Sequence, residues 1–350
     1  MKRSLKILAP VLISLFFTVN NNKVMAGNKD RAGQAGASEL LINPWARSTG
    51  WGSSNSACVR GLESMYSNIA GTAFTNGTEV IFAHSIWLQG SGISINSFGL
   101  TQKVGEAGVL GLGIVSFGFG DIDITTVDHP EGGIGTYSPS FMNIGISYAK
   151  IFSNSIYGGI NIRVISESTP DITGQGVAFD AGIQYVTGEK ENIKFGISLK
   201  NVGPRMSYTG DGLSFRTAVN SSTMTVEQRS ADFELPSLVN IGGAYDYLIN
   251  KNHRVTFAGN FTSNSFTNDQ YSGGIEYAFM NRFMVRGGYT YESDITDDVT
   301  SLTTFKGLSA GFTVEVPFSK ESKSTFGLDY SFISTRNFGG CHNIGVRINL

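Results

Sequence analysis

Residues 308–316 read LSAGFTVEV, and residues 344–350 read IGVRINL. In both stretches apolar residues alternate with small or polar ones, so an extended strand would have one apolar face and one polar face. Residues 193–200, IKFGISLK, repeat the pattern. A strand of this kind has to cover its apolar face with protein or with lipid.

Segments of this kind follow one another from Thr78 to the last residue. We predict fourteen of them, an even number as in bacterial outer-membrane barrels. Most reach the length of about 9–11 residues that crosses a bilayer at a tilt. Their predicted bounds are 78–88, 92–102, 107–125, 140–152, 156–168, 175–187, 192–202, 235–249, 253–264, 270–280, 282–293, 303–317, 324–335 and 341–350.

The connections between these segments differ in length on the two sides of the sheet. Those after even-numbered strands are short, for example 153–155, 188–191 and 250–252. Several after odd-numbered strands are long and polar, namely 126–139, 203–234 and 294–302. Short periplasmic turns and longer extracellular loops are typical of outer-membrane barrels. Residues 78–350 are therefore predicted to form an all-β, 14-stranded antiparallel transmembrane barrel, whereas a soluble β-sandwich or propeller would not require one-sided loops.

The first 26 residues have the parts of a secretory signal peptide. Three of the first six residues are basic, residues 7–19 are apolar, and Val24 and Ala26 precede a predicted cleavage site before Gly27. We therefore expect an exported, multi-pass barrel in the outer membrane. The composition agrees, because 44 Gly, 24 Phe, 13 Tyr and 15% charged residues suit strands that meet lipid. A net charge of −2 argues against a nucleic-acid partner.

Residues 27–77 lack the alternation and carry charges of both signs. Because fourteen strands enclose more space than wall side chains fill, we predict that this segment is a plug or hatch inside the lumen. The faces opposite the apolar ones supply charges to the lumen: Arg163, Asp180, Lys194, Lys200, Glu276, Arg286, Glu315 and Arg347. Buried charges need partners, so an ion-pair network is expected to hold the plug to the wall. Hydrated charges in a water-filled barrel are the alternative.

Several motifs recur in an order that is known from one group of barrels. Residues 44–52, PWARSTGWG, resemble its Ala-Arg-x-x-Gly-x-Gly motif, which here involves Arg47, Gly50 and Gly52. Residues 67–71, SNIAG, are similar to its Asn-Pro-Ala-Gly element, with Ile69 at the proline position. The matching positions of that element are Asn68, Ala70 and Gly71. Further counterparts lie at residues 178–185, 195–203, 274–277, 286–289 and 328–330. Over nearly the whole mature chain, the sequence resembles the FadL-like barrels, and within them the PorV/PorQ group of Bacteroidota.

This resemblance implies a 14-stranded barrel with an N-terminal hatch. FadL carries hydrophobic small molecules across the outer membrane, whereas PorV and PorQ serve type IX protein secretion as barrel partners of the translocon. We therefore predict a non-enzymatic accessory or scaffold subunit of an outer-membrane protein machine, with type IX secretion as the leading case. Its partners would be outer-membrane lipid and other outer-membrane or surface proteins. The alternative is a FadL-like transporter of hydrophobic small molecules, which would also bind lipid-like amphiphiles.

One enzymatic hypothesis remains as a remote alternative. Outer-membrane proteases can place an Asp-His pair opposite an Asp pair at the extracellular rim, and Asp128-His129 and Asp297-Asp298 fall in predicted extracellular loops. Such dipeptides arise easily in polar loops, so we predict that the protein is not an enzyme. No metal site or cofactor is predicted either, because no two histidines stand at metal-ligand spacing. The histidines are His84, His129, His253 and His342.

Two further features leave alternatives open. The long loop 203–234 holds Tyr208, Phe215 and Phe233, which suit a protein partner if they are exposed and a lid over the barrel mouth if they are packed. Cys58 and Cys341 are the two cysteines of an exported chain. They either form a disulfide that closes a very long loop or remain as two buried free thiols.

Overall fold

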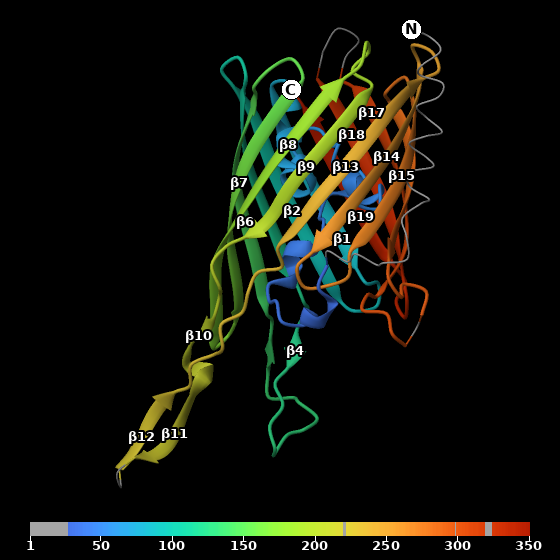
Figure 1. Ribbon diagram of the computed structural model, residues 1–350. Coiled ribbons are helices and arrows are strands. Elements are labelled where there is room, and N and C mark those ends of the chain that lie inside the picture. Colours follow the sequence, from blue (N-terminus) through green and yellow to red (C-terminus); the bar gives the residue numbers. More distant parts are fainter. Residues whose placement is uncertain (1–26, 220–221, 298, 319–323) are drawn as a thin grey trace.

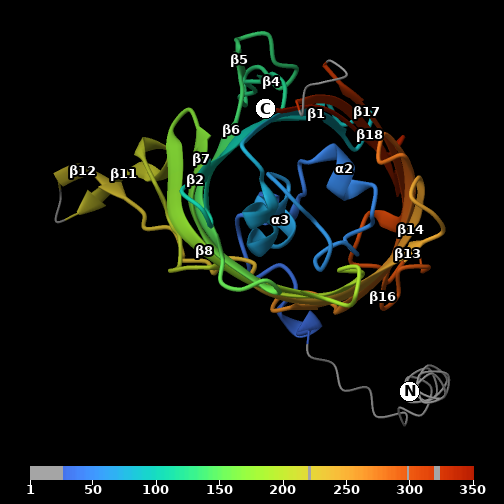
Figure 2. The same cartoon turned by 90° about the horizontal axis from the view of Figure 1, so that it is seen from above.

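The computed structural model describes residues 27–219, 222–297, 299–318 and 324–350, so the predicted signal peptide lies outside the described residues. In this part of the chain fourteen strands form one antiparallel sheet that closes on itself (Figures 1 and 2). The strands are β1 (Thr78–Trp87), β2 (Ile93–Val104), β3 (Gly108–Gly118), β6 (Ser140–Ile151), β7 (Ile156–Thr169), β8 (Ile172–Thr187), β9 (Ile193–Val202), β13 (Leu238–Leu248), β14 (His253–Asn264), β15 (Gln270–Phe279), β16 (Phe283–Glu292), β17 (Phe305–Pro317), β18 (Thr325–Thr335) and β19 (Cys341–Asn349).

The barrel closes where the first and last strands meet. β1 pairs with β2 on one side and with β19 on the other, so that Phe82 lies between Phe98 and Val346. β8 pairs with β9, and β9 pairs with β13, which completes the ring. Within the described part of the chain, the ring leaves no unpaired barrel edge, as a sheet in a bilayer requires. The predicted 14-stranded antiparallel barrel is thereby confirmed.

The predicted strand bounds are close to the observed ones, with one clear exception. The third predicted strand, 107–125, is too long, because β3 ends at Gly118. Gly120 then adopts a φ of +73°, which turns the chain out of the sheet. Two short strands, β4 (Ile122–Asp123) and β5 (Thr136–Tyr137), pair with each other in the connection that follows.

Side chains alternate between the outside and the lumen, as the sequence pattern predicts. On β9, Phe195 and Ile197 point outward and are more than half exposed, while Lys194 on the opposite face is buried inside. The outer surface is rich in such exposed apolar side chains, which suits contact with lipid. None of the helices among the described residues is long and apolar enough to cross a membrane.

The two ends of the barrel differ. The C-terminus lies at one end with the short turns, and the longest connections project from the other (Figure 1). Following the usual loop asymmetry, we name these ends periplasmic and extracellular. The extracellular loop 203–234 contains β10 (Tyr208–Thr209), η4 (Asp211–Leu213), β11 (Ser214–Val219) and β12 (Ser222–Glu227).

The N-terminal segment, residues 27–77, runs inside the ring, where Figure 2 shows its two α-helices. Its helices are η1 (Lys29–Arg31), η2 (Ser38–Leu41), α2 (Ala46–Thr49), α3 (Ser64–Ser67) and η3 (Ile69–Phe74). α2 contacts β17, β18 and β19, and η3 contacts β6, β7 and β8, so the segment spans the lumen from wall to wall. Its apolar side chains, such as Leu62 and Ala57, are completely buried there.

Candidate functional site

The N-terminal segment follows a line of inward-facing glycines on the barrel wall. A Cβ atom at Gly196 would lie 2.6 Å from the carbonyl oxygen of Ser56, and one at Gly311 would lie 3.3 Å from the Cα atom of Gly50. Backbone can approach a strand this closely only where the strand has no side chain. We call these positions the glycine girdle: Gly99, Gly111, Gly159, Gly182, Gly196, Gly242, Gly274, Gly288, Gly311 and Gly345. The lumen wall is therefore shaped to fit this segment.

Asn68 attaches the segment to β8 and β9. Its Nδ2 lies 3.0, 3.2 and 3.4 Å from the accepting carbonyl oxygens of Ser56, Ile183 and Ile197, respectively. Its Oδ1 accepts the amide of Ala70 at 3.2 Å and so caps the start of η3. This amide side chain therefore joins two wall strands to two turns of the segment.

The rest of the 67–71 motif packs around this point. Ala70 is completely buried in a cluster with Ala149 and Tyr157. Gly71 lies against the carbonyl of Val59, where a Cβ atom would clash. The motif residues Asn68, Ala70 and Gly71 thus all take part in the packing at this point.

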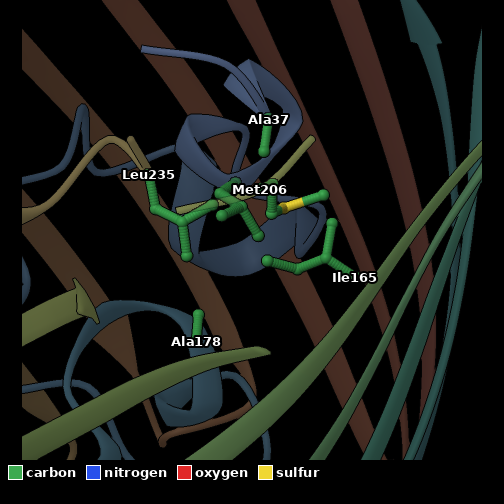
Figure 3. Close-up of a cluster of buried hydrophobic side chains, with 6 residues drawn as sticks. Ala37, Ile165, Ala178, Met206 and Leu235 are labelled. Carbon is green, nitrogen blue, oxygen red and sulfur yellow. The ribbon is translucent and has the colours of Figure 1, made fainter. Parts of the chain in front are cut away.

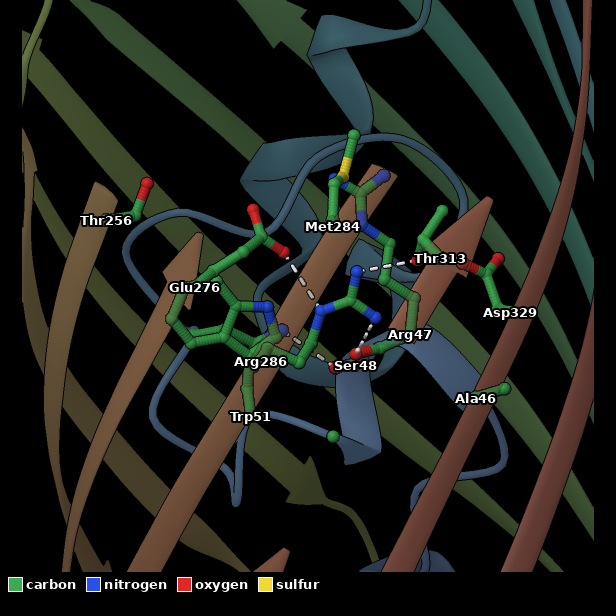
Figure 4. Close-up of polar contacts among 12 residues, drawn as sticks. Ala46, Arg47, Ser48, Trp51, Thr256, Glu276, Met284, Arg286, Thr313 and Asp329 are labelled. Atoms are coloured by element: carbon green, nitrogen blue, oxygen red, sulfur yellow. Dashed lines mark hydrogen bonds and ion pairs between the residues drawn. The ribbon is translucent and has the colours of Figure 1, made fainter. Parts of the chain in front are cut away.

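Arg286 forms a second attachment point (Figure 4). Its Nε donates to Glu276 at 2.9 Å, its Nη2 donates to Thr313 at 2.6 Å, and its Nη1 approaches the carbonyl oxygen of Arg47 at 3.5 Å. The Arg47 guanidinium itself donates to the sulfur of Met284 at 3.4 Å. The charged wall side chain therefore holds the backbone of the segment, while the Arg47 head group contacts a thioether at this point.

The two glycines of the 44–52 motif lie beside this point. Gly50 packs against the backbone of Gly311, and the carbonyl of Gly52 accepts a hydrogen bond from Thr290 at 2.7 Å. The motifs that the sequence places at residues 44–52, 274–277 and 286–289 are therefore in mutual contact. Their order along the chain reflects a single packed surface.

The ion pairs of the lumen differ from the expectation. Among the described residues, the pairs deep in the lumen join neighbouring wall strands rather than segment and wall: Arg163–Asp180 at 2.8 Å, Lys194–Asp246 at 2.6 Å, Arg254–Glu276 at 3.2 Å, Arg286–Glu276 at 2.9 Å and Arg347–Asp329 at 2.9 Å. One ion pair of the segment, Arg31–Glu234 at 3.0 Å, reaches loop 203–234 instead of a wall strand. Glu315 instead accepts a hydrogen bond from Thr325 at 2.8 Å. The prediction that ion pairs join the plug to the wall was therefore wrong, because the charged wall side chains pair with each other.

The reason lies in strand register. Glu276 and Arg286 are directly opposite each other on β15 and β16, and the residue pairs Arg163–Asp180 and Arg347–Asp329 are diagonal neighbours across adjacent strands. Long side chains reach a partner most easily over these short separations. The segment, with its short helices, contributes mainly backbone carbonyls and small hydroxyls to its contacts with the wall.

The wall also has a buried polar cluster that the alternation does not predict. Asn201 has a φ of +57° at a register shift between β8 and β9, so both it and Lys200 point inward. The side-chain oxygen of Asn201 accepts a hydrogen bond from Arg163 at 3.0 Å, and the backbone N–H of Asn201 donates to Asp180 at 2.8 Å. The ammonium of Lys200 lies 3.5 Å from the ring centre of Tyr66, a cation–π contact with the segment.

The two cysteines are free thiols, Cys341 buried and Cys58 partly buried, which is closer to the second of the two predicted alternatives. Cys58 lines an inner cavity with Lys194 and Glu276, and burial raises the pKa of its thiol to about 11. Cys341 begins β19 at the extracellular end, where its sulfur accepts the amide of Leu88 at 3.3 Å. The thiols therefore have separate surroundings and form no disulfide.

Two adjoining cavities lie in the extracellular half of the lumen, with volumes of about 260 and 160 Å³. Both are lined by Leu41, Asn43 and Tyr66 of the N-terminal segment and by Phe305 of the wall. Trp87 lines the smaller cavity, and its ring meets that of Phe305 edge-on at 5.6 Å. The smaller cavity combines Trp87, Phe305 and other apolar side chains with polar ones, whereas most of the side chains that line the larger cavity are polar.

A third cavity of about 550 Å³ lies at the periplasmic end, beside residue 350. Its charged lining consists of Arg47, Arg60, Glu79, Glu315 and Arg347. The N-terminal segment contributes residues to this cavity as well as to the two extracellular ones. The segment is thus the element that lies between the two ends of the lumen.

The loop 203–234 divides into a packed base and a projecting tip. Tyr208 and Phe233 stack at 5.2 Å at the base, where Phe233 packs on a buried cluster. Phe215, which is 50% exposed, lies on the β11–β12 hairpin that projects from the barrel (Figure 1). The base of the loop is therefore packed, as in the lid alternative, and its hairpin is exposed, as in the partner-binding alternative.

The residues of the protease hypothesis are not brought together by any contact in the described ranges. Asp128 and His129 lie in the exposed connection between β4 and β5. Asp297 accepts the backbone amide of Val299 at 2.8 Å, and Asp298 lies outside the described residues. Among the described residues, no group of three or more His, Cys, Asp or Glu could hold a metal ion.

Comparison with known proteins gives similarity at the level of structure. No protein-family model and no curated protein matches the sequence. The CymD monoaromatic hydrocarbon channel has a TM-score of 0.53 and 14% identity, covering 88% of this chain and 97% of that chain. The toluene transporter TbuX of Ralstonia pickettii has a TM-score of 0.53 and 11% identity, covering 88% of this chain and 98% of that chain.

A FadL homologue of Pseudomonas aeruginosa has a TM-score of 0.50 and 10% identity, covering 87% of this chain and 96% of that chain. At such low identities the likeness concerns the fold alone. These similar structures are channels and transporters rather than enzymes. The chain thus has the fold of the FadL-like outer-membrane barrels, a closed antiparallel sheet of fourteen strands.

Proposed function

We propose that this protein admits a hydrophobic small molecule through the outer membrane, with residues 27–77 acting as its plug. The observation that carries the proposal is the smaller of the two extracellular cavities, where Trp87 and Phe305 form an aromatic wall. The similarity in fold to the monoaromatic hydrocarbon channel CymD supports it. This order reverses the one expected from the sequence, in which the transporter was the alternative.

The molecule would bind first in the extracellular cavities. Leu41 and Tyr66 of the N-terminal segment line both cavities, and the segment lies between them and the periplasmic cavity, so further passage would require the segment to shift. The charged periplasmic cavity beyond it suits a hydrated exit rather than a second apolar site. The molecule would therefore bind at the extracellular end of the lumen and leave at the periplasmic end.

The first test fills the cavities. Thr303 lines both of them, and Thr303→Phe is expected to lower the affinity for a monoaromatic probe such as toluene at least tenfold, because the added ring occupies the space. Binding is followed through the fluorescence of Trp87, with Trp87→Phe identifying the signal. Mass spectrometry of the purified barrel would also detect a bound amphiphile.

Thr300→Phe is the matched control, because Thr300 is exposed on the same loop and lines neither cavity. It should bind the probe like the parent protein. Equal affinity in the parent and in Thr303→Phe, or no binding by the parent protein, would contradict the proposed site.

The projecting hairpin supports a second candidate function, an accessory subunit of an outer-membrane protein machine such as that of type IX secretion. Phe215 and Val226 face each other on one side of the β11–β12 hairpin, next to the half-exposed Met224. In the β4–β5 connection, Val127 is 99% exposed. Two-stranded hairpins are marginally stable alone in water, and exposed apolar side chains at their tips suit a protein partner.

Removing the hairpin tests this second candidate. Leu213 and Gln228 are joined by a backbone hydrogen bond of 2.9 Å, so a short Gly-Ser turn can replace residues 214–227 without strain on the loop base. The shortened protein should fold as before and lose proteins that co-purify with the parent in mild detergent. A parent protein that purifies alone would remove the support for this function, and toluene binding should be unchanged in either case.

A further inference from the structure

The base of loop 203–234 packs directly on the N-terminal segment. Ala37 and Leu40 of the segment share a buried cluster with Met206 and Leu235 of the loop (Figure 3). The wall completes the cluster with Ile165 and Ala178. An extracellular loop and the lumenal segment are thus joined by an apolar contact that excludes water.

Polar contacts reinforce the same junction. Glu234 of the loop accepts hydrogen bonds from Arg31 at 3.0 Å and from Arg205 at 2.8 Å, and these hold the pKa of its carboxyl below the ordinary value. The backbone N–H of Gly36 donates to the Glu234 carbonyl at 3.1 Å, beside a bridge between Glu234 and Ala35. The loop base therefore adds a short stretch of sheet-like pairing to the segment.

A pair of buried carboxyl groups lies beneath this junction. Glu39 of η2 is 7% exposed and Glu167 of β7 is 2% exposed, and the hydroxyl of Tyr208 in the loop donates to Glu167. Burial, and secondarily the neighbouring Glu167, raise the pKa of Glu39 to about 8. The three side chains come from the segment, the wall and the loop, so they connect all three.

The other ionisable groups around Glu39 do not neutralise the pair. Arg163 of β7 faces it but is engaged with Asp180 at 2.8 Å and Asn201 at 3.0 Å. Tyr66 lines the same small cavity as Glu39 and Arg163 and donates to the carbonyl of Leu41. Two buried carboxyl groups at close range disfavour the state in which both are ionised, so the Glu39 carboxyl beside Glu167 keeps its proton to a higher pH than an exposed one.

We propose that residues 31–40 and the base of loop 203–234 form a proton-dependent latch over the extracellular cavities, closed while the Glu39 carboxyl beside Glu167 holds a proton. Leu41 and Asn43 follow the latch directly in the chain and line both cavities, so its release changes access to them. The latch is a contact between the loop and the segment, so this proposal does not depend on which of the two proposed functions is correct.

The pH dependence follows from proton linkage. The closed latch binds a proton that the released one loses, since Glu39 has a raised pKa only when it is buried beside Glu167. The latch is therefore strongest below the ordinary pKa of 4.5 and weakens as the pH rises towards about 8. Within that window its closing equilibrium changes by up to about tenfold per pH unit.

Thiol labelling measures the latch without any ligand. The full-length protein carries Ala37→Cys in a Cys58→Ala, Cys341→Ala background, and Ala37 is buried in the junction. Its rate of maleimide labelling is divided by that of Val127→Cys, a fully exposed reference in the same background. This ratio removes the intrinsic pH dependence of thiol reactivity.

We expect the ratio to rise at least tenfold between about pH 6 and about pH 8. Glu39→Gln, which cannot ionise, should keep the ratio low and constant. Should that variant not fold, Glu167→Gln should reduce the rise, because it removes the second of the causes that raise the pKa of Glu39 while burial remains. A constant ratio in the parent, or an equal rise in the glutamine variant, would overturn the latch. Because no substrate is present, a failure of toluene binding leaves this result unaffected.

Discussion

Valine at Gly288 should displace the N-terminal segment from the barrel wall, whereas valine at the adjacent Gly287 should leave it in place. A Cβ atom at Gly288 would meet the carbonyl of Trp51 and lie 2.8 Å from the amide nitrogen of Gly52. Both are backbone atoms, which cannot rotate away as a side chain can. We expect a loss of about 3 kcal/mol in the contact, the upper range for overpacking.

The displaced segment should open the lumen. Conductance in planar bilayers and cleavage of the N-terminal segment by added protease would both increase in Gly288→Val. Gly287→Val is the matched control, because it lies on the other face of β16 and its Cβ would approach only the carbonyl of Ser309, at 3.7 Å. Equal behaviour of the two variants would show that the segment does not close the barrel by fitting the glycine girdle.

Arg347→Leu should destabilise the barrel by about 3–5 kcal/mol, the range for removing one partner of a buried ion pair. Arg347 donates to both carboxylate oxygens of Asp329, at 3.1 and 2.9 Å, and both side chains are almost fully buried. The substitution leaves the Asp329 charge without its guanidinium partner beside the closing strand β19. Urea unfolding in lipid vesicles measures the change.

A second substitution separates the ion pair from simple packing. Asp329→Asn alone should cost less, and combined with Arg347→Leu it should recover part of the lost stability, because no uncompensated charge remains. If the two changes are additive, the pair contributes no coupling and the loss comes from packing alone. Arg254 offers a comparison, because its side chain is more exposed and its ion pairs, with Asp246 at 3.8 Å and with Glu276 at 3.2 Å, are longer.

Most of the fold could be predicted because strand alternation and loop length are local properties of the sequence. The segments around Ile197, Phe312 and Val346 each have one apolar face, and their order determines which end is periplasmic. The end of β3 was missed because the sequence after Gly118 continues to alternate as far as Ile124. Gly120 ends the strand through its backbone conformation, which alternation does not reveal.

Strand alternation and loop length predict less of the candidate site than of the fold. Alternation places Arg286 and Glu276 in the lumen, but their pairing depends on the register between β15 and β16. Asp246 was missed although it has the inward parity of Gly242 and Ala244, a signal that extending the alternation along β13 would have found. The cavities beside Phe305 arise from the path of the N-terminal segment, which has no periodic pattern.

The glycine girdle has a consequence for how this sequence can diverge. On the outer wall, Ile, Val, Leu and Phe all present apolar surface to lipid, so related chains can exchange them freely at positions such as Ile197. At Gly196, across the same strand, any side chain would occupy the volume of Ser56 and Ala57. An alignment of relatives should therefore show two rates of substitution that alternate along each strand, slow where the wall meets the N-terminal segment and fast where it meets the membrane.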